Sequence, residues 1–419
     1  MNTIPEIEMQ DSSASERGFD KPHLVWIQPG LLKALDQATW IEMTREIRMR
    51  GWEVSLITTG PSCVKQINDV EVECIPTINF YFLRQAVFNL RVFLIVVNRR
   101  EEIDVLLFHQ LTAPWILPLK LLRRFRNDFN LVFVLDTRTV PMELKNKSSL
   151  KDRIRTRFYQ AIGVAGNFVS DGQTTITGRL AEMVHIPQES LWGTWPSGVD
   201  PERFKVSIRD RTWPGEKDAI QIMYIGILHY ERNLMQLARA ILRANQDGMK
   251  FFLSLIGWGT EQPALEEIAN RYPQYIDIHH PVPHIEIPSC LAKAHVGALP
   301  FPDLPQFRVS SPIKLFEYMA SALPIFATRI DCHMDVIKDG NYVFWAEDAS
   351  EEGLLVGLHQ IWEKRASLQQ MGMDSLKAVD SWTWGKSAEK LLQALEYGIA
   401  KRRVDVEILS KRQPMTRNN

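Results

Sequence analysis

The chain has 419 residues, in which 49 lysines and arginines face 50 aspartates and glutamates. Its length exceeds one ordinary hydrophobic core, so about two to three domains are expected. The net charge of −1 gives no reason to expect nucleic acid as a partner. The four cysteines are scattered without metal-ligand spacing, which is typical of reduced thiols in a cytoplasmic protein. No apolar run reaches the roughly 18–20 residues of a membrane span.

The first half of the chain alternates short apolar runs with helical patterns. Residues 1–20 are polar and lack an apolar core, so we expect a disordered tail rather than a signal peptide. The predicted strands are 24–27, 54–58, 105–108, 131–135 and 167–169. This alternation predicts a parallel, doubly wound α/β sheet, and we assign residues 21–200 to a first Rossmann-like domain.

The pattern restarts after a polar linker at about 201–218. The predicted strands are 220–225, 251–256, 276–279, 296–299 and 324–327. We assign residues 201–382 to a second Rossmann-like domain, a helix at 383–400 to the first domain, and 404–419 to a disordered tail. Because ligands of such sheets bind at the carboxyl ends of the strands, both halves should face a central cleft.

The most informative stretch is 310–331, which reads SSPIKLFEYMASALPIFATRID. Ser310 and Ser311 can cap a helix whose first turn holds Pro312 and Lys314. A cation in a first turn opposes the helix dipole, so Lys314 makes sense if an anion binds at this helix start.

Glu317 lies three residues after Lys314, on the same face of the predicted helix. A carboxylate just behind an anion site is well placed to accept hydrogen bonds from ribose hydroxyls. Strand, loop, helix and strand together therefore predict a site for a nucleotide diphosphate. The simpler alternative is a surface ion pair between Lys314 and Glu317.

This run resembles the nucleotide-sugar motif of GT-B glycosyltransferases, in particular the retaining family 4 and its relatives. Further segments resemble that family in the same order, over about residues 22–400: GLLKALDQATWIEMTREIRMRGWEVSLIT, DVLLFHQ, LDTRTVP, PSGVDPERF and YIGILHYERNL. The resemblance implies the GT-B fold, with two Rossmann-like domains facing a central cleft. It also implies transfer of a sugar from a nucleotide-diphosphate donor, with retention of the anomeric configuration. The acceptor would be a cell-surface polysaccharide, a glycolipid or a lipid-linked glycan.

The resemblance also implies which residues bind the donor. In the resembling enzymes the glutamate binds the ribose, and the helix start and a cation after the first strand of the second domain bind the diphosphate. The implied donor-binding residues are Glu317, Lys314, Arg232, Ser310, Ser311, Pro312, Ile313, Gly30, Gly257 and Val282. The alternatives are a solvated charge for Arg232 and a simple tight turn for Gly257.

On the acceptor side the resemblance implies two catalytic candidates, His109 and Asp136. His109 ends the strand at 105–108, where the family carries a histidine near the transferred sugar. Asp136, with Arg138, follows the strand at 131–135 and could contact the acceptor or orient His109. The alternatives are a structural histidine and a local ion pair.

Three positions depart from the family pattern. Val309 stands where the first glutamate of an E-x7-E motif is expected, and Ile227 replaces a phosphate-binding arginine, whose charge His229 or Arg308 could supply. Ala322 stands at a helix stop where glycine is usual, which costs about 1 kcal/mol if the residue is left-handed. The departures indicate a variant group or a loss of activity.

No metal or cofactor is expected, because paired carboxylates with metal-ligand spacing and a G-x-G-x-x-G motif are both missing from the sequence. Residues 120–157 hold eleven lysines and arginines against four acids, a local net of +7, downstream of several aromatic residues. This pattern favours docking of 80–157 on an anionic membrane surface, on the inner face of the cell membrane; the alternative is solvated helix faces.

Three rival functions remain open. An inverting, glucuronosyl-type transferase of the same fold would use Asp136 as base. A nucleotide-sugar epimerase would need no acceptor. A degenerate transferase would act as a scaffold and bind no nucleotide.

Overall fold

The computed structural model describes residues 21–31, 37–60, 63–67, 70–76, 81–125, 129–139, 157 and 162–412. The predicted tail at 1–20 lies outside these residues, as does most of the basic segment after residue 139.

The first domain is built on an eight-stranded sheet in the order β3-β4-β2-β1-β5-β6-β7-β8. Its strands are β1 (His23–Leu31), β2 (Glu53–Thr59), β3 (Cys63–Ile67), β4 (Val70–Ile75), β5 (Val105–His109), β6 (Val132–Thr137), β7 (Gly172–Thr175) and β8 (Leu191–Thr194). All neighbours are parallel except β3 and β4. Its helices include α1 (Gln37–Met49), α2 (Tyr81–Asn98), η1 (Gln110–Thr112), α3 (Ala113–Phe125) and α5 (Gly178–Met183).

The second domain is built on a six-stranded, all-parallel sheet in the order β11-β10-β9-β12-β13-β14. The strands are β9 (Ile220–Ile227), β10 (Phe251–Trp258), β11 (Ile276–His279), β12 (Val296–Leu299), β13 (Ile325–Thr328) and β14 (Val343–Ala346). The helices of this half, with the linker, are η2 (Pro201–Phe204), α6 (Lys205–Arg209), η3 (Tyr230–Arg232), α7 (Leu234–Gln246), α8 (Gln262–Arg271), η4 (His284–Glu286), α9 (Ile287–Leu291), α10 (Pro305–Arg308), α11 (Ile313–Ala320), α12 (Asp331–Ile337), α13 (Glu351–Glu363), η5 (Arg365–Ser367), α14 (Leu368–Ala378) and η6 (Val379–Trp382). Both faces of each sheet pack against apolar side chains, as a doubly wound sheet requires.

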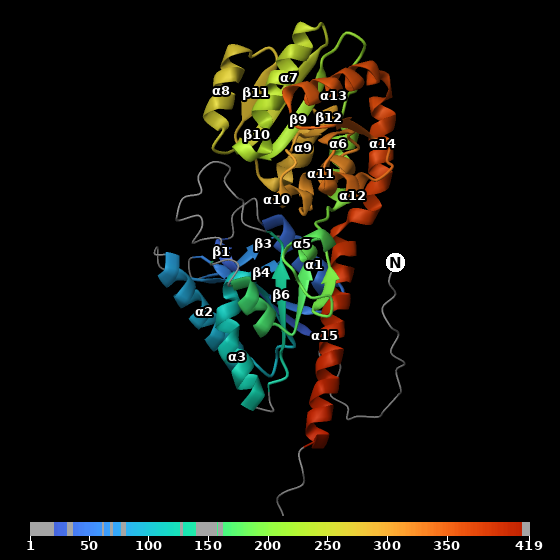
Figure 1. The fold of residues 1–419 in the computed structure, drawn as a ribbon. Coiled ribbons are helices and arrows are strands. Elements are labelled where there is room, and N and C mark those ends of the chain that lie inside the picture. Colours follow the sequence, from blue (N-terminus) through green and yellow to red (C-terminus); the bar gives the residue numbers. More distant parts are fainter. Residues whose placement is uncertain are drawn as a thin grey trace, which may run out of the picture.

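The chain crosses between the domains twice, and the two crossings are hydrogen-bonded to each other. The amide of Val199 donates to the carbonyl of Trp382, and the amide of Trp384 donates to the carbonyl of Val199. Gly198 is needed here because a Cβ would lie 2.6 Å from the backbone of Thr383. The last helix, α15 (Trp384–Arg412), then runs back along the first domain and packs in its core (Figure 1).

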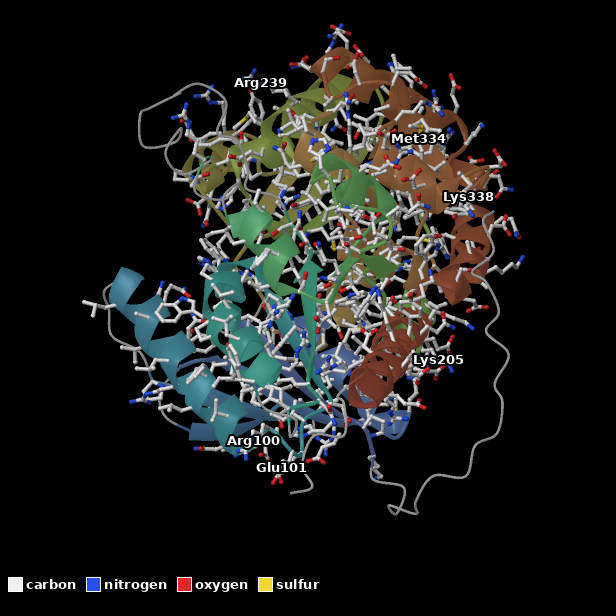
Figure 2. The ribbon with its side chains drawn as sticks, turned by 60° about the horizontal axis from the view of Figure 1, so that its bottom comes forward. Arg100, Glu101, Lys205, Arg239, Met334 and Lys338 are labelled. Carbon is white, nitrogen blue, oxygen red and sulfur yellow. The ribbon has the colours of Figure 1, made fainter. Side chains whose placement is uncertain are left out.

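The carboxyl edges of the two sheets face each other. Thr177 follows β7 in the first domain, and its hydroxyl donates to the carbonyl of Val309, which follows β12 in the second. Arg100 and Glu101 precede β5 at the opposite, amino edge, and Figure 2 shows them at the end of the first domain far from Arg239 of the second.

The structure corrects two of the predicted elements. Residues 167–169 belong to a helix over 162–169, because Ile162, Gly166 and Val169 are buried at the spacing of one helix face, and the next strand is β7. Residues 404–412, predicted as tail, continue α15, since no proline interrupts the helix before residue 414. Strands β3, β4, β7, β8 and β14 were not predicted. Among the described helices, none is long and apolar enough to cross a membrane.

Candidate functional site

Helix α11 carries the central residues of the predicted donor site. It begins at Ile313, with Pro312 as its N-cap residue and no side-chain cap. The predicted capping by Ser310 and Ser311 is therefore wrong. The hydroxyl of Ser310 donates to the carbonyl of Phe307, and that of Ser311 accepts from the amide of Ser197 in the linker. The N–H groups at the start of α11 are thus left without a side-chain cap.

Lys314 reaches from α11 to the carboxyl ends of β9 and β10. Its side chain occupies the space above Gly226, where a Cβ would lie 2.1 Å from its Cε and 2.5 Å from its Nζ. Gly226 is the register partner of Gly257, and both have positive φ, +143° and +155°. A Cβ on Gly257 would lie 1.7 Å from the carbonyl oxygen of Gly226. These glycines let the lysine and two strand ends come together.

A second cation, Arg232, lies beside Lys314. Its guanidinium stands over the rings of Phe301 and Phe307, each at 5.0 Å. The pKa of Lys314 is lowered to about 8, first by burial and then by the charge of Arg232, while Glu317 acts in the opposite direction. Since like charges repel, two neighbouring cations at a strand edge favour an anion between them.

Glu317 is 6% exposed and lies on the same helix, one turn after Lys314. Its Oε1 is 2.9 Å from Nε2 of His284, the first residue of η4. This hydrogen bond is the largest cause of a raised pKa of His284. Glu317 pairs with His284. The alternative, an ion pair between Lys314 and Glu317, is not formed among the described residues.

A small cavity of about 10 Å³ lies between Glu317 and His284 on one side and the interdomain linker on the other, where Val199 and Arg203 line it. It has room for one water molecule and not for a ribose. A ribose would therefore have to use the other carboxylate oxygen, or displace His284. Arg203 is held by a bidentate ion pair to the buried Glu42 of α1, at 2.6 and 2.9 Å.

The remaining predicted donor residues are spread around this centre. Val282 is half-buried against the second-domain core, two residues before His284. Ile313 packs against the core of the first domain, so the start of α11 is wedged between the domains. Gly30 lies near the carboxyl end of β1, at the same sheet edge as His109.

His109 ends β5, and its Nδ1 accepts a hydrogen bond from the amide of Leu111 at 3.2 Å. In the neutral ring the proton is therefore on Nε2. Burial lowers the pKa of His109 to about 4, so the imidazole is neutral near pH 7. It can donate one hydrogen bond through Nε2 but cannot act as a cation.

Asp136 is the register partner of His109 and is 2% exposed. Its Oδ1 accepts from the hydroxyl of Thr174 at 2.7 Å and from the indole of Trp195 at 3.0 Å. Arg138 stacks on the ring of Trp195, with Cζ 3.5 Å from its centroid. Burial raises the pKa of Asp136. Asp136 is thus bound into a local cluster rather than hydrogen-bonded to His109.

Two of the three departures have a physical account in the structure. Val309 is 4% exposed and packs with Ile176 and Leu180 of the first domain. Ala322 is left-handed as expected, with φ +52°, and its carbonyl accepts from the buried Arg211 at 3.1 Å.

Each of the two groups proposed to replace a cation at Ile227 has a partner within the second domain. Arg308 pairs bidentately with Asp303, at 2.6 Å for both bonds. His229 accepts at Nδ1 from the amide of Thr260 at 3.0 Å.

Two residues of the site were missed from sequence, His284 and Gly226. Gly226 had a signal, since it stands in the quoted run YIGILHYERNL. The sequence contains no sign of the pairing of His284, because its partner Glu317 lies 33 residues away along the chain.

Residues 219–364 match the family model described as glycosyl transferases group 1. In sequence, no curated protein matches the chain. Among solved structures, similarity extends over nearly the whole chain. Sucrose-phosphate synthase from Thermosynechococcus elongatus has a TM-score of 0.66 at 12% identity, covering 92% of this chain and 100% of that one.

Two further structures agree. The catalytic domain of starch synthase IV from Arabidopsis thaliana, bound to ADP and acarbose, has a TM-score of 0.70 at 11% identity, covering 91% of this chain and 100% of that one. Anabaena HepE in complex with UDP has a TM-score of 0.65 at 12% identity, covering 90% and 100%. The predicted GT-B fold is confirmed, and so is the prediction of a glycosyltransferase; membership of the retaining family 4 stays a prediction.

Proposed function

We propose that this glycosyltransferase takes its sugar from a nucleotide-diphosphate donor and transfers it with retention of configuration, without a metal. The observation that carries the donor proposal is the convergence of Arg232 and Lys314 at the carboxyl ends of β9 and β10. A diphosphate placed there neutralises both cations. Its growing charge in the transition state is stabilised by the same groups.

Similar proteins support the choice of donor. The solved complexes of Anabaena HepE contain UDP and UDP-glucose, and the starch synthase IV structure contains ADP. We therefore place the diphosphate at Arg232, Lys314 and the start of α11, and the ribose at Glu317. The loop from Ser310 to Ile313, with Gly257, Val282 and Gly30, would surround the donor.

Retention is favoured over inversion by the state of Asp136. An inverting enzyme needs a carboxylate base that reaches the acceptor hydroxyl, but Asp136 is 2% exposed: Oδ1 accepts two hydrogen bonds, and Oδ2, which has no partner among the described residues, is buried. His109 is neutral, and its Nε2 has no hydrogen-bond partner among the described residues, so it is suited to hold a sugar hydroxyl. The acceptor proton would pass to the leaving phosphate.

The first experiment is thermal stabilisation by UDP, GDP, ADP and their sugars. A ligand at about 100 times its Kd adds roughly 2.7 kcal/mol to the free energy of unfolding. We expect one nucleotide to stabilise the wild type, and the shift to fall in Glu317→Gln and Lys314→Met. Glu347→Gln is the matched control, because Glu347 is exposed and its ion pair among the described residues is with Arg329, away from the site. If a folded wild type responds to no nucleotide, the scaffold alternative replaces this proposal.

We also propose that the acceptor is carried at an anionic membrane. On α2 the exposed side chains Leu83, Leu90 and Leu94 share one helix face, and on α3 Leu121 and Phe125 are 50% and 81% exposed. Exposed apolar side chains that are followed in the sequence by a basic segment suit an anionic membrane surface. Phe88, one of the aromatic residues upstream of the basic segment, does not contribute, because it is fully buried.

The membrane proposal is tested by sedimentation with vesicles of phosphatidylcholine and phosphatidylglycerol. We expect Leu90→Glu/Leu94→Glu to reduce the bound fraction while nucleotide binding is kept. Val356→Glu is the control, since Val356 is exposed on α13 of the second domain. Equal sedimentation of the double variant and the control would contradict the proposal.

A further inference from the structure

A second cavity, of about 260 Å³, lies at the amino edge of the first sheet. It is lined by Lys120 and Arg123 of α3, Trp192 of β8, and Lys401 and Arg402 of α15, with Asp171 just before β7. His109 and Asp136 end their strands at the opposite edge. Lys401 also lies 17 residues beyond the start of α15 at the linker, roughly 26 Å along the helix. This cavity is therefore distinct from the donor site.

The lining of the cavity is positively charged. Lys120, Arg123, Lys401 and Arg402 face two carboxylates, Asp171 and Asp405.

Asp171 is already engaged by three groups. It pairs through both oxygens with Arg123, accepts from the amide of Phe133 at 2.9 Å, and lies 3.9 Å from Nζ of Lys120. Asp405 is therefore the remaining carboxylate of the lining that can neutralise the positive charge of Lys401 and Arg402.

Two hydrogen-bond donors of the cavity lack an acceptor. Nε of Arg402 and Nε1 of Trp192 are buried and have no hydrogen-bond partner within the described chain. Both groups can only donate. Lys401 lies over the ring of Trp192, with Nζ 5.9 Å from its centroid. What the cavity lacks is thus an oxygen-rich anion that accepts from a guanidinium, an ammonium and an indole.

We propose that this cavity binds a phosphate group. Arginine forks and lysines are the side chains that bind phosphate most strongly, and the indole N–H adds a directed donor. Its volume is slightly below the range of ordinary small-molecule pockets, which suits a phosphomonoester or a pyrophosphate better than a nucleotide.

The phosphate has two candidate sources, a soluble phosphorylated compound and the headgroup of an anionic lipid. Phe168, which is 71% exposed, lies near the rim, where Nζ of Lys120 is 5.9 Å from its ring and donates to its carbonyl at 3.0 Å. An apolar side chain beside a basic cavity is compatible with either source, so the experiment separates them.

The test uses the full chain with Arg232→Ala, which weakens phosphate binding at the proposed donor site. Inorganic pyrophosphate is titrated calorimetrically into this parent and into the parent with Lys401→Gln/Arg402→Gln. We expect the Kd to rise at least about tenfold, because hydrogen bonds to charged groups are lost. Arg403→Gln is the matched control, an exposed arginine of the same helix outside the lining.

A second arm uses vesicles of phosphatidylcholine with and without phosphatidic acid. Binding of pyrophosphate that is lost in the double variant assigns a soluble ligand. Binding only to phosphatidic acid vesicles, lost in the same variant, assigns a lipid headgroup. If the double variant misfolds, Trp192→Phe removes the indole N–H and keeps an aromatic ring. Unchanged affinity of the cavity variants for both probes, or no binding of either probe by the parent, overturns the proposal.

Discussion

The carboxylate of Glu317 is held in place by His284, and this pair makes the site sensitive to pH. The folded-state pKa of His284 is raised above its ordinary value of 6.5, first by the hydrogen bond to Glu317. A raised pKa means that the folded state holds the proton more tightly than the unfolded chain. The stabilisation is therefore fully present below about pH 6.5, and it is lost as the pH rises through the folded pKa.

We expect the variant His284→Asn to lose this pH dependence. Urea midpoints of wild type and variant should differ most near pH 6 and converge as the pH rises above the folded pKa. His359→Asn is the control, because His359 is half exposed and lies 4.0 Å from Asp247. A difference between wild type and His284→Asn that does not change with pH would show that the pair contributes only packing.

His109 has the opposite pKa shift and a different role. We expect His109→Ala to keep nucleotide affinity, since His109 lies on the first domain, and to lower kcat/KM for sugar transfer roughly 10- to 100-fold through one lost hydrogen bond. Because burial lowers its pKa to about 4, this histidine should cause no break in the pH–rate profile between pH 6 and 8. Loss of nucleotide binding in His109→Ala would contradict the assignment.

At the scale of elements, the ends of β9 and β10 depend on two glycines in the left-handed half of backbone space. Gly257 has φ +155°, and any Cβ would overlap the carbonyl of Gly226. Gly248 also has positive φ, +90°, but no atom lies within 4 Å of its Cβ position. A side chain at Gly257 would therefore cause both backbone strain and steric overlap, whereas a side chain at Gly248 would cause strain alone.

We expect Gly257→Ala to cost about 3 kcal/mol or more, since backbone must shift, and Gly248→Ala to cost about 1 kcal/mol from strain alone. Denaturant unfolding of both variants measures the difference. Nucleotide binding should weaken only in Gly257→Ala, because only that residue lies next to Gly226 and Lys314. Similar losses of stability in the two variants would contradict the argument.

At the scale of the whole molecule, the domains meet through contacts of the residues just before α11. Val309 packs on Ile176 and Leu180, and Ser311 accepts from the amide of Ser197. Arg179 of α5 donates to Asp335 of α12 at 2.7 and 2.9 Å, which adds an exposed ion pair between the domains. These contacts hold the carboxyl edges of the two sheets together.

We expect Val309→Glu to separate the domains rather than restore a family-like active site. A carboxylate in this apolar cluster is buried without a partner, so opening the interface is less costly than keeping it closed. Small-angle scattering should report a larger radius of gyration for this variant than for the wild type and for Val356→Glu. An unchanged radius together with raised transfer activity would show instead that the glutamate is accommodated.

Much of the fold could be predicted because apolar runs and turn residues are local signals. Strands β11 and β12 have the predicted bounds, and the left-handed Ala322 follows from its place after a helix. The prediction of a strand at 167–169 was wrong, because an apolar run of three residues does not distinguish a strand from a helix. The caps of α11 were wrong because Ser310 and Ser311 find partners elsewhere in the fold.

The sequence by itself determined two doubly wound domains and the candidates Lys314 and Glu317, because alternating runs and spacing are local properties, and its resemblance to a known family implied the GT-B architecture and Arg232. Only the tertiary structure decided that His284 holds Glu317, that Gly226 makes room for Lys314, and that four basic side chains line a cavity at the amino edge. Each of these contacts joins segments far apart in the chain. They exist only where packing brings those segments together, which no local pattern records.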